Sequence, residues 1–382
     1  MSPSRTIIGV VALAAVTGCA SNDTTSASGT VSVRSTADAC EVSATEAPSG
    51  NVVFEVENGG SDVTEFYLLA DDGLRIIGEV ENIGPGITRN LVVRVAPGSY
   101  VTACKPNMTG DGIRGGFTVT DSGADGVADA GETEELIATA TEQYRLYVRD
   151  QVSQLVDKTE QFADLYAAGA DDEARALYAD ARTHWERIEP VAESFGDLDP
   201  KLDLREADLE PGQEWTGWHT IEKDLWPPDA GYTPLSDDER SVLSAQLVAD
   251  TADLASRVEE LTFDATQLGN GAKELLDEVA TGKVTGEEEI WSHTDLWDFQ
   301  ANVDGARIAF EALEPALRTK DDELADTLAT RFESLQALLD QHRSGGGFVL
   351  YTELSDAEVR DLAAAVQALG EPLAELTAAV VL

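Results

Sequence analysis

The chain has 382 residues, and its 72 acidic side chains against 26 basic ones give a formal net charge of −46. A field of this sign repels nucleic acid and attracts cations, although an acidic surface is also typical of proteins that stay soluble in salty media. The length accommodates two or three domains, and the apolar content is sufficient for a sizeable core.

The first nineteen residues predict export. Arg5 precedes an apolar run from Ile7 to Val16 that is too short to span a bilayer, and Val16-Thr17-Gly18-Cys19 fits a lipobox, in which the cysteine is lipidated. Residues 1–19 are therefore a predicted lipoprotein signal peptide, and the small polar residues 20–30 are a predicted tether. We expect a protein anchored by Cys19 at the outer face of the cytoplasmic membrane.

Residues 31–120 are predicted to form an all-β domain. Their β-branched and aromatic runs are bounded by Gly, Asn, Asp or Pro, at the regular spacing of a small sandwich. The runs are Val52–Val56, Val63–Leu69, Leu74–Val80, Leu91–Val95 and Phe117–Val119. The following stretch, 121–131, is rich in Gly, Ala and Asp, which is typical of a linker.

Residues 132–382 change to a helical period. Leu, Ala and Val recur at helical spacing, and Ser236 and Ser355 precede acidic residues as helix caps do. Short loops between long helices mean antiparallel neighbours, so we expect an up-and-down helical bundle. The expected helices are Glu134–Ala167, Asp171–Phe195, Asp237–Leu261, Ala272–Ala280, Asp295–Leu317, Asp321–His342 and Asp356–Val380.

The stretch 217–226 indicates a metal site. It has the pattern of a helix, on which the three-residue spacing places His219 and Glu222 on one face. Trp218 and Leu225 belong to a separate apolar stripe that can bury the helix, and buried polar groups need partners. The pair therefore predicts two ligands that face a cleft.

Other carboxylates are candidates to complete the ligand set. Glu186 and Glu189 repeat the three-residue spacing, Asp203 lies shortly before the stretch 217–226, and Glu289 and Asp295 flank a further helix start. Oxygen ligands with one imidazole suit a hard or borderline cation, and ferric or ferrous iron fits better than copper(I).

Each of these carboxylates also has a purely structural interpretation. Glu186 and Glu189 are typical of a solvated acidic face, and Glu287–Glu289 of an acidic run that complements a helix N-terminus. Asp295 lies three residues after Ser292, as in a capping box.

A zinc peptidase is the alternative for a His-x-x-Glu pair. Such a helix carries two histidines four residues apart, with a glutamate base next to the first. Positions 220 and 223 are Thr220 and Lys223, so both the base and the second histidine are missing. Hydrolysis is therefore disfavoured.

The predicted β domain contains two cysteines, Cys40 and Cys104, with Glu65 on a strand between them. A blue-copper site needs two histidines, and the first histidine of the chain is His184, outside this domain. In an exported protein the two cysteines predict a disulfide, while a thiolate and carboxylate site for copper or iron, with Met108 nearby, is the alternative.

Three separated motifs occur together in this order: Glu186-Arg187-Ile188-Glu189-Pro190, Gly217-Trp218-His219-Thr220-Ile221-Glu222-Lys223-Asp224-Leu225-Trp226 and Ser292-His293-Thr294-Asp295-Leu296-Trp297-Asp298-Phe299. The set resembles the imelysin family, specifically its EfeO group, over nearly the whole mature chain. The resemblance implies an N-terminal cupredoxin-like β-sandwich followed by an imelysin-like helical bundle.

The resemblance also implies a function and a ligand set. EfeO proteins are the extracytoplasmic component of the EfeUOB iron-uptake system, so we expect a non-enzymatic protein that passes iron to an EfeU-like permease, alongside an EfeB-like haem peroxidase. By position, the metal ligands fall on His219, Glu222, Glu186, Glu189, Asp203 and Glu289, with Asp295 in the motif, and a second metal site falls on Cys40, Glu65 and Cys104. Copper and zinc are further candidate metals. A peptidase, a cupredoxin-domain ferroxidase and a structural surface lipoprotein are the alternative functions.

Overall fold

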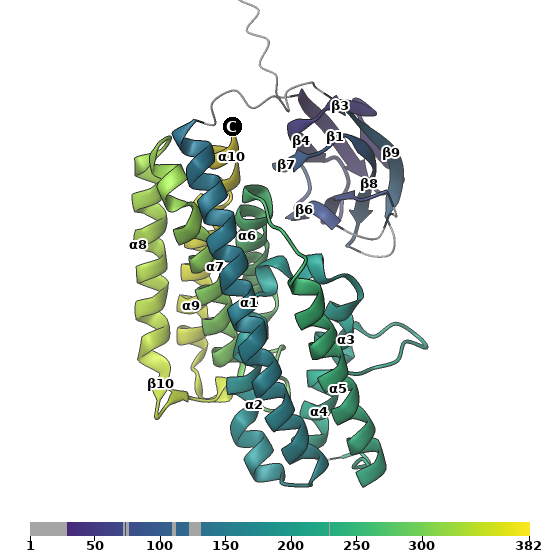
Figure 1. Cartoon of the computed structure of the whole chain (residues 1–382), viewed down its shortest axis with the longest axis vertical. Coiled ribbons are helices and arrows are strands. Elements are labelled where there is room, and N and C mark those ends of the chain that lie inside the picture. The colour runs from purple at the N-terminus through teal and green to yellow at the C-terminus, as the bar shows by residue number, and fades with distance from the viewer. Residues whose placement is uncertain (1–28, 72, 74–75, 109–111, 122–130, 229) are drawn as a thin grey trace, which may run out of the picture.

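A computed structural model describes residues 29–71, 73, 76–108, 112–121, 131–228 and 230–382. The predicted signal peptide with Cys19, nearly all of the tether, and residues 122–130 of the predicted linker lie outside these residues. The predicted order of a β domain followed by a helical domain is confirmed (Figure 1).

The β domain consists of two sheets packed face to face. Its strands are β1 (Gly29–Thr36), β2 (Ala39–Val42), β3 (Glu46–Pro48), β4 (Gly50–Asn58), β5 (Thr64–Leu69), β6 (Ile76–Ile83), β7 (Thr88–Val95), β8 (Gly98–Pro106) and β9 (Ile113–Thr120). One sheet has the order β2-β1-β4-β7 and the other β3-β9-β8-β5-β6. Val52, Phe54 and Val56 alternate inward along β4, and the ring of Phe54 lies 5.2 Å from that of Phe66 in the facing sheet.

A disulfide joins the two sheets. Cys40 of β2 and Cys104 of β8 are bonded, with their Cα atoms 5.6 Å apart. Cys104 is fully buried in the sandwich core. The bond therefore ties the edge strand of one sheet to a central strand of the other.

The second domain is built of antiparallel helices. They are α1 (Glu132–Ala167), α2 (Asp171–Glu186), α3 (Asp199–Asp203), α4 (Trp218–Leu225), α5 (Asp237–Val258), α6 (Ala265–Thr281), α7 (Asp295–Arg318), α8 (Asp322–Leu339), α9 (Asp356–Leu373) and α10 (Leu376–Val381), with the short pair β10 (Arg343–Ser344) and β11 (Gly347–Phe348). The long helix α1 packs against α2, α5 and α7. Residues Asp356–Val381 are long and apolar enough to span a membrane, but α9 packs against α6 and α8 in the bundle.

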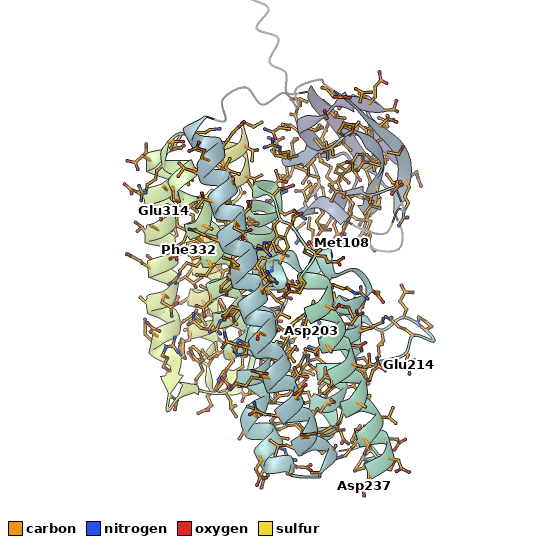
Figure 2. All side chains as sticks on the ribbon, viewed as in Figure 1. Met108, Asp203, Glu214, Asp237, Glu314 and Phe332 are labelled. Atoms are coloured by element: carbon orange, nitrogen blue, oxygen red, sulfur yellow. A yellow bond between two sulfur atoms is a disulfide. The ribbon has the colours of Figure 1, made fainter. Side chains whose placement is uncertain are left out.

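The helix expected from Asp171 to Phe195 is interrupted. α2 ends at Glu186, and a stretch of 3-10 turns, Glu189–Leu198, follows it. Pro190 is the reason, because its ring cannot continue an α-helix and it lacks an amide donor. The break redirects the chain toward α3, which delivers Asp203 to the centre of the domain (Figure 2).

Direct contacts join the two domains. α6 packs on β6 and β7, and Asn270 on α6 donates from Nδ2 to the Val92 carbonyl at 3.2 Å. At the end of the chain, the carbonyl of Val381 accepts a hydrogen bond from Asn51 Nδ2 in β4, and the carbonyl of Val380 accepts one from Lys320 Nζ at 2.9 Å. α10 is therefore held at the seam between the domains.

Candidate metal centre

α4 is fixed in place by its first residue and its apolar side. Gly217 precedes the helix with a φ of 83°, and a Cβ on it would collide with the carbonyl of Leu202. Trp218 is fully buried, with its ring 5.0 Å from Phe162 and 5.9 Å from Tyr178. This packing turns the opposite side of α4 toward the middle of the domain.

His219 lies at the centre of the candidate site. Its ring is fully buried, and Nε2 lies 3.4 Å from Asp203 Oδ1 and 3.5 Å from Glu288 Oε1. Both separations exceed an ordinary hydrogen bond, and Nε2 has no hydrogen-bond partner among the described residues. One ligand atom from each of these three residues lies within 4.8 Å of the others, so the three could hold one metal ion together.

Glu222 lies on the other side of the imidazole, with Oε2 3.2 Å from His219 Nδ1. Its second oxygen, Oε1, accepts hydrogen bonds from the backbone amides of Trp291 at 3.0 Å and Ser292 at 2.8 Å. A carboxylate in this position holds a proton on Nδ1 and leaves Nε2 for a metal ion. Glu222 can thus orient the histidine as well as ligate, and with His219 and Glu289 it forms a second group of convergent ligand atoms.

Glu289 lies in the turn before α7, and Asp295 is the first residue of α7. Glu289 accepts from Tyr178 Oη at 3.1 Å and from Ser292 Oγ at 2.9 Å. Asp295 Oδ1 accepts from the amide of Glu289 at 3.1 Å. Since α7 begins after Thr294 without a side-chain cap, the capping box considered for Ser292 and Asp295 is absent.

Glu186, the last residue of α2, is fully buried and Glu189 just beyond it is partly buried, and both are held by polar partners. Lys283 Nζ lies 2.9 Å from Glu186 Oε2 and 2.7 Å from Glu189 Oε2. Asn302 on α7 donates from Nδ2 to the same two oxygens at 2.9 Å and 2.7 Å. The interpretation of the two glutamates as a solvated face is therefore wrong, because Lys283 and Glu186 are both fully buried.

A guanidinium lies among these carboxylates. Arg182 on α2 is fully buried, and it contacts acidic side chains from α2, α3, the turn before α7 and α7 itself. Nη1 contacts Asp203 and Nη2 contacts Glu186, while Nε lies 2.6 Å from Glu289 and 3.4 Å from Asp298, and Nη2 lies 3.6 Å from Glu288.

The charges that surround His219 shift its titration and that of its neighbours. Burial opposes the ionisation of both Asp203 and Glu288. Nevertheless, the charges of Arg182 and His219 hold the pKa of Asp203 well below its usual range. In the same way, Lys283 and His219 lower the pKa of Glu288 to about 2. Burial also disfavours the imidazolium, as does Arg182, yet the close approach of Asp203 and other carboxylates outweighs both and raises the pKa of His219 well above its usual value. The carboxylates around the imidazole therefore favour positive charge at this position.

The pKa values of other carboxylates in the cluster are raised. Burial, with the charge of Glu222 added, raises the pKa of Glu289 well above its usual value, and burial does the same for Asp298 against the effect of Arg182. Burial raises the pKa of Asp295 to about 6. The cluster contains more carboxylates than its own cations can neutralise, which favours an added cation.

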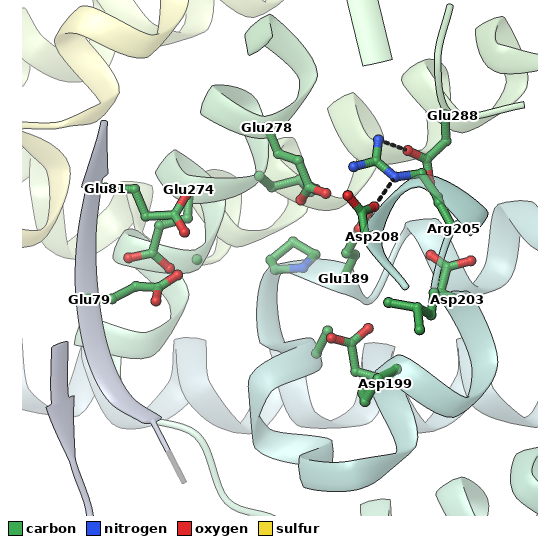
Figure 3. A pocket seen from close by; sticks show the side chains of 16 residues that line it. Glu79, Glu81, Glu189, Asp199, Asp203, Arg205, Asp208, Glu274, Glu278 and Glu288 are labelled. Atoms are coloured by element: carbon green, nitrogen blue, oxygen red, sulfur yellow. Dashed lines mark hydrogen bonds and ion pairs between the residues drawn. The ribbon is translucent and has the colours of Figure 1, made fainter. Parts of the chain in front are cut away.

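A cavity of about 390 Å³ leads from the domain seam to this cluster. Glu79 and Glu81 of β6 line one wall and Glu274 and Glu278 of α6 another, while Glu189, Asp203 and Glu288 lie at its inner end (Figure 3). Arg205 crosses the inner end, 3.3 Å from Glu288 and 2.8 Å from Asp208. Between the seam and this guanidinium, the cavity is lined by negative side chains, which attract cations.

The β-domain candidates do not converge in the same way. Cys40 and Cys104 are joined as a disulfide, so neither offers a thiolate, and Glu65 Oε2 accepts from Tyr67 Oη at 2.9 Å. Met108 is 46% exposed. Among the described residues, no group of three metal-ligating side chains includes Cys40, Glu65 or Cys104.

The structure gathers all the predicted helical-domain residues into one buried region, and it adds four more. Glu288 belongs to the acidic run 287–289, but the sequence does not indicate which glutamate points inward. Arg182, Lys283 and Asp298 are charged residues of kinds that are rarely buried unless paired, so their residue type predicts exposure.

Comparison with known proteins agrees with this architecture. A sequence profile of imelysin matches residues 140–376, and a profile of the cupredoxin-like domain matches residues 9–119. Proteins named iron uptake system component EfeO from Escherichia coli strain K12 and Shigella flexneri are 35% identical over 353 residues, which cover 91% of this chain and 90% of theirs. The EfeO of Escherichia coli O157:H7 is 35% identical over 355 residues.

Fold and site together define a two-domain protein in which a β-sandwich precedes a helical domain with a buried histidine and carboxylate cluster. The cupredoxin-like and imelysin profiles cover these two parts. The chain belongs to the imelysin family and, within it, to the EfeO group.

Proposed function

We propose that this protein is an extracytoplasmic iron-binding component of an EfeUOB-type uptake system, with iron as its cargo. The observation that carries the proposal is the convergence of His219 Nε2, Asp203 Oδ1 and Glu288 Oε1, with Nε2 buried and free of hydrogen bonds among the described residues. A buried imidazole nitrogen without a partner is costly unless a ligand completes it.

The donor set favours iron among the candidate metals. One imidazole and several carboxylates suit a hard or borderline cation, whereas soft thiolate donors would suit copper(I). The relatives named iron uptake system components support the same choice. Ferric and ferrous iron, copper and zinc are to be compared in one binding experiment.

The seam cavity is the proposed entry path. Its walls carry Glu79, Glu81, Glu274 and Glu278, and its inner end reaches Asp203 and Glu288, two of the three central ligands. The net charge of −46 increases the local concentration of cations around the whole molecule. The β domain thus contributes one wall of the path to a site in the helical domain.

We further propose that the captured iron is delivered to an EfeU-like membrane permease, alongside an EfeB-like haem peroxidase. The lipobox motif at Cys19 supports a tether at the outer face of the cytoplasmic membrane, next to such a permease. Mass spectrometry of the mature protein tests the tether, and an unmodified Cys19 refutes it.

We propose a binding function in preference to an enzymatic one. Thr220 and Lys223 stand where a zinc peptidase helix needs its base and its second histidine. Casein cleavage and oxygen-dependent iron oxidation are the two assays for the peptidase and ferroxidase alternatives. Turnover in either assay contradicts this part of the proposal.

Calorimetric titration with iron tests the site. We expect stoichiometric binding by the wild type and its loss in His219→Ala and Asp203→Asn. The matched control is His184→Ala, because His184 is also buried but contacts Gln151 at 3.0 Å, outside the cluster. Unchanged binding in His219→Ala and Asp203→Asn refutes the proposed site.

A further inference from the structure

Arg182 faces the same oxygens as His219. Asp203 Oδ1 lies 3.4 Å from His219 Nε2 and contacts Arg182 Nη1. Glu288 Oε1 lies 3.5 Å from His219 Nε2 and 3.6 Å from Arg182 Nη2. Two of the three ligand atoms of the proposed centre are therefore shared with a guanidinium.

Because the oxygens of Asp203 and Glu288 are shared, they cannot bind a metal ion and the Arg182 guanidinium fully at the same time. A metal ion between His219 Nε2, Asp203 Oδ1 and Glu288 Oε1 would lie next to the fixed positive charge of Arg182, which does not lose its proton in proteins. A strong metal–carboxylate bond also uses the lone pairs with which Asp203 Oδ1 now accepts a hydrogen bond from the guanidinium. The ion and Arg182 thus compete for Asp203 and Glu288.

Arg182 also contacts carboxylates that are not part of the proposed three-residue centre. Its Nε lies 2.6 Å from Glu289 Oε1 and 3.4 Å from Asp298 Oδ1, and its Nη2 contacts Glu186. Neither oxygen of Asp298 makes a hydrogen bond among the described residues. The guanidinium can therefore give up Asp203 and remain paired inside the domain.

We propose that Arg182 is a resident cation of the metal-free site, which occupies the ligand oxygens of Asp203 and Glu288 and yields them when iron binds. This inference rests on the proposed iron site. Arg182 keeps the carboxylates assembled without metal and weakens iron binding, so that the ion can be released again. A ligand or a merely structural residue would have the opposite effect on affinity, because its loss weakens binding.

The test is the affinity of Arg182→Gln for ferric iron supplied as its nitrilotriacetate chelate, measured by competition calorimetry. We expect binding about tenfold tighter than in the wild type, or more, because one positive charge next to the ion is removed. The unfolding temperature of the metal-free variant is expected to fall, and iron is expected to raise it more than in the wild type. Equal or weaker binding by the folded variant overturns the inference.

The matched control is Arg240→Gln. Arg240 is also largely buried and paired with two carboxylates, Asp171 and Asp224, which lie outside the cluster. Its replacement is expected to lower stability and leave iron affinity within about twofold of the wild type. Tighter binding in the control as well refutes a specific effect of Arg182.

A second measurement does not depend on the variant folding. In a crystal structure of the wild type with iron bound, Arg182 Nη1 is expected to have left Asp203 Oδ1 while Nε keeps Glu289. Iron bound by His219, Asp203 and Glu288 with the Arg182–Asp203 contact intact overturns the inference and leaves the proposed function standing. A wild type that binds no iron refutes the proposed function itself.

Discussion

Glu222→Gln separates the role of Glu222 as an orienting residue from its role as a ligand. The substitution keeps the shape of the side chain, and its carbonyl oxygen can still accept from the amides of Trp291 and Ser292, as Glu222 Oε1 does now. Its NH₂ group then faces His219 Nδ1, where the carboxylate lies 3.2 Å away at present. Because an NH₂ group only donates, it cannot accept the Nδ1 proton that a metal-bound imidazole would carry, so the ring form with Nε2 free for iron is disfavoured.

This change therefore opposes the ring form whose Nε2 lone pair would bind an ion between Asp203 and Glu288. Loss of a carboxylate that orients a metal-bound histidine typically weakens metal binding by about 10- to 100-fold, or about 1.4 to 2.8 kcal/mol. The fold should persist, since every polar group of the new side chain keeps a partner. The expected phenotype is therefore weak iron binding in a protein of nearly normal stability.

The assay is iron titration calorimetry together with thermal unfolding of the metal-free protein. Glu222→Asp is the companion variant: it keeps the charge but is one methylene shorter, so it should retain more affinity than Glu222→Gln. The reasoning is refuted if Glu222→Gln binds iron within about twofold of the wild type.

Three further predictions concern pH, the disulfide and the start of α4. Each unit of acidification below neutrality is expected to weaken iron binding about tenfold, because the raised pKa of His219 leaves a proton on the ring that the ion must displace; a binding enthalpy that is independent of the buffer contradicts this proton release. Replacing Cys40 and Cys104 by serine opens a loop of 64 residues and is expected to cost about 4 kcal/mol of β-domain stability, with an unchanged unfolding midpoint as the opposing result. Gly217→Ala is expected to lower stability by about 2 kcal/mol or more and to weaken iron binding, because Gly217 has a positive φ and an added Cβ would collide with Leu202. The control is Gly346→Ala, which should change neither property because a Cβ at Gly346 meets open space.

The sequence predicted the elements whose patterns are local. The helix period is strong in α1, α5 and α7, and these helices begin and end within a few residues of the expected positions. Strand β8 was not predicted, although it is central in its sheet, because Gly98–Pro106 mixes polar and apolar residues without clear alternation. Strand β1 pairs in parallel with β4, although β2 and β3 lie between them in the chain, and no local pattern indicates this pairing.

The same holds for the site: residues placed by local helix spacing could be predicted from the sequence, and residues placed by tertiary contacts could not. His219 and Glu222 could be predicted because one turn of helix fixes their spacing, and the apolar stripe beside them indicates burial. Arg182 could not, because its burial depends on four separate segments meeting around it. Predicting that Glu288, rather than Glu287, faces His219 requires the geometry of an irregular turn, and such a turn has no periodic sequence pattern.

The hydrogen bond between Asn51 and Val381 has a practical consequence for experiments on this protein. Any peptide fused after Leu382 would leave the chain one residue beyond that bond, at the seam where α10 meets the β domain. A purification tag placed there would disturb the contacts that join the two domains, and an oligohistidine tag would add its own metal affinity. A cleavable fusion ahead of the β-sandwich avoids both effects in iron-binding measurements.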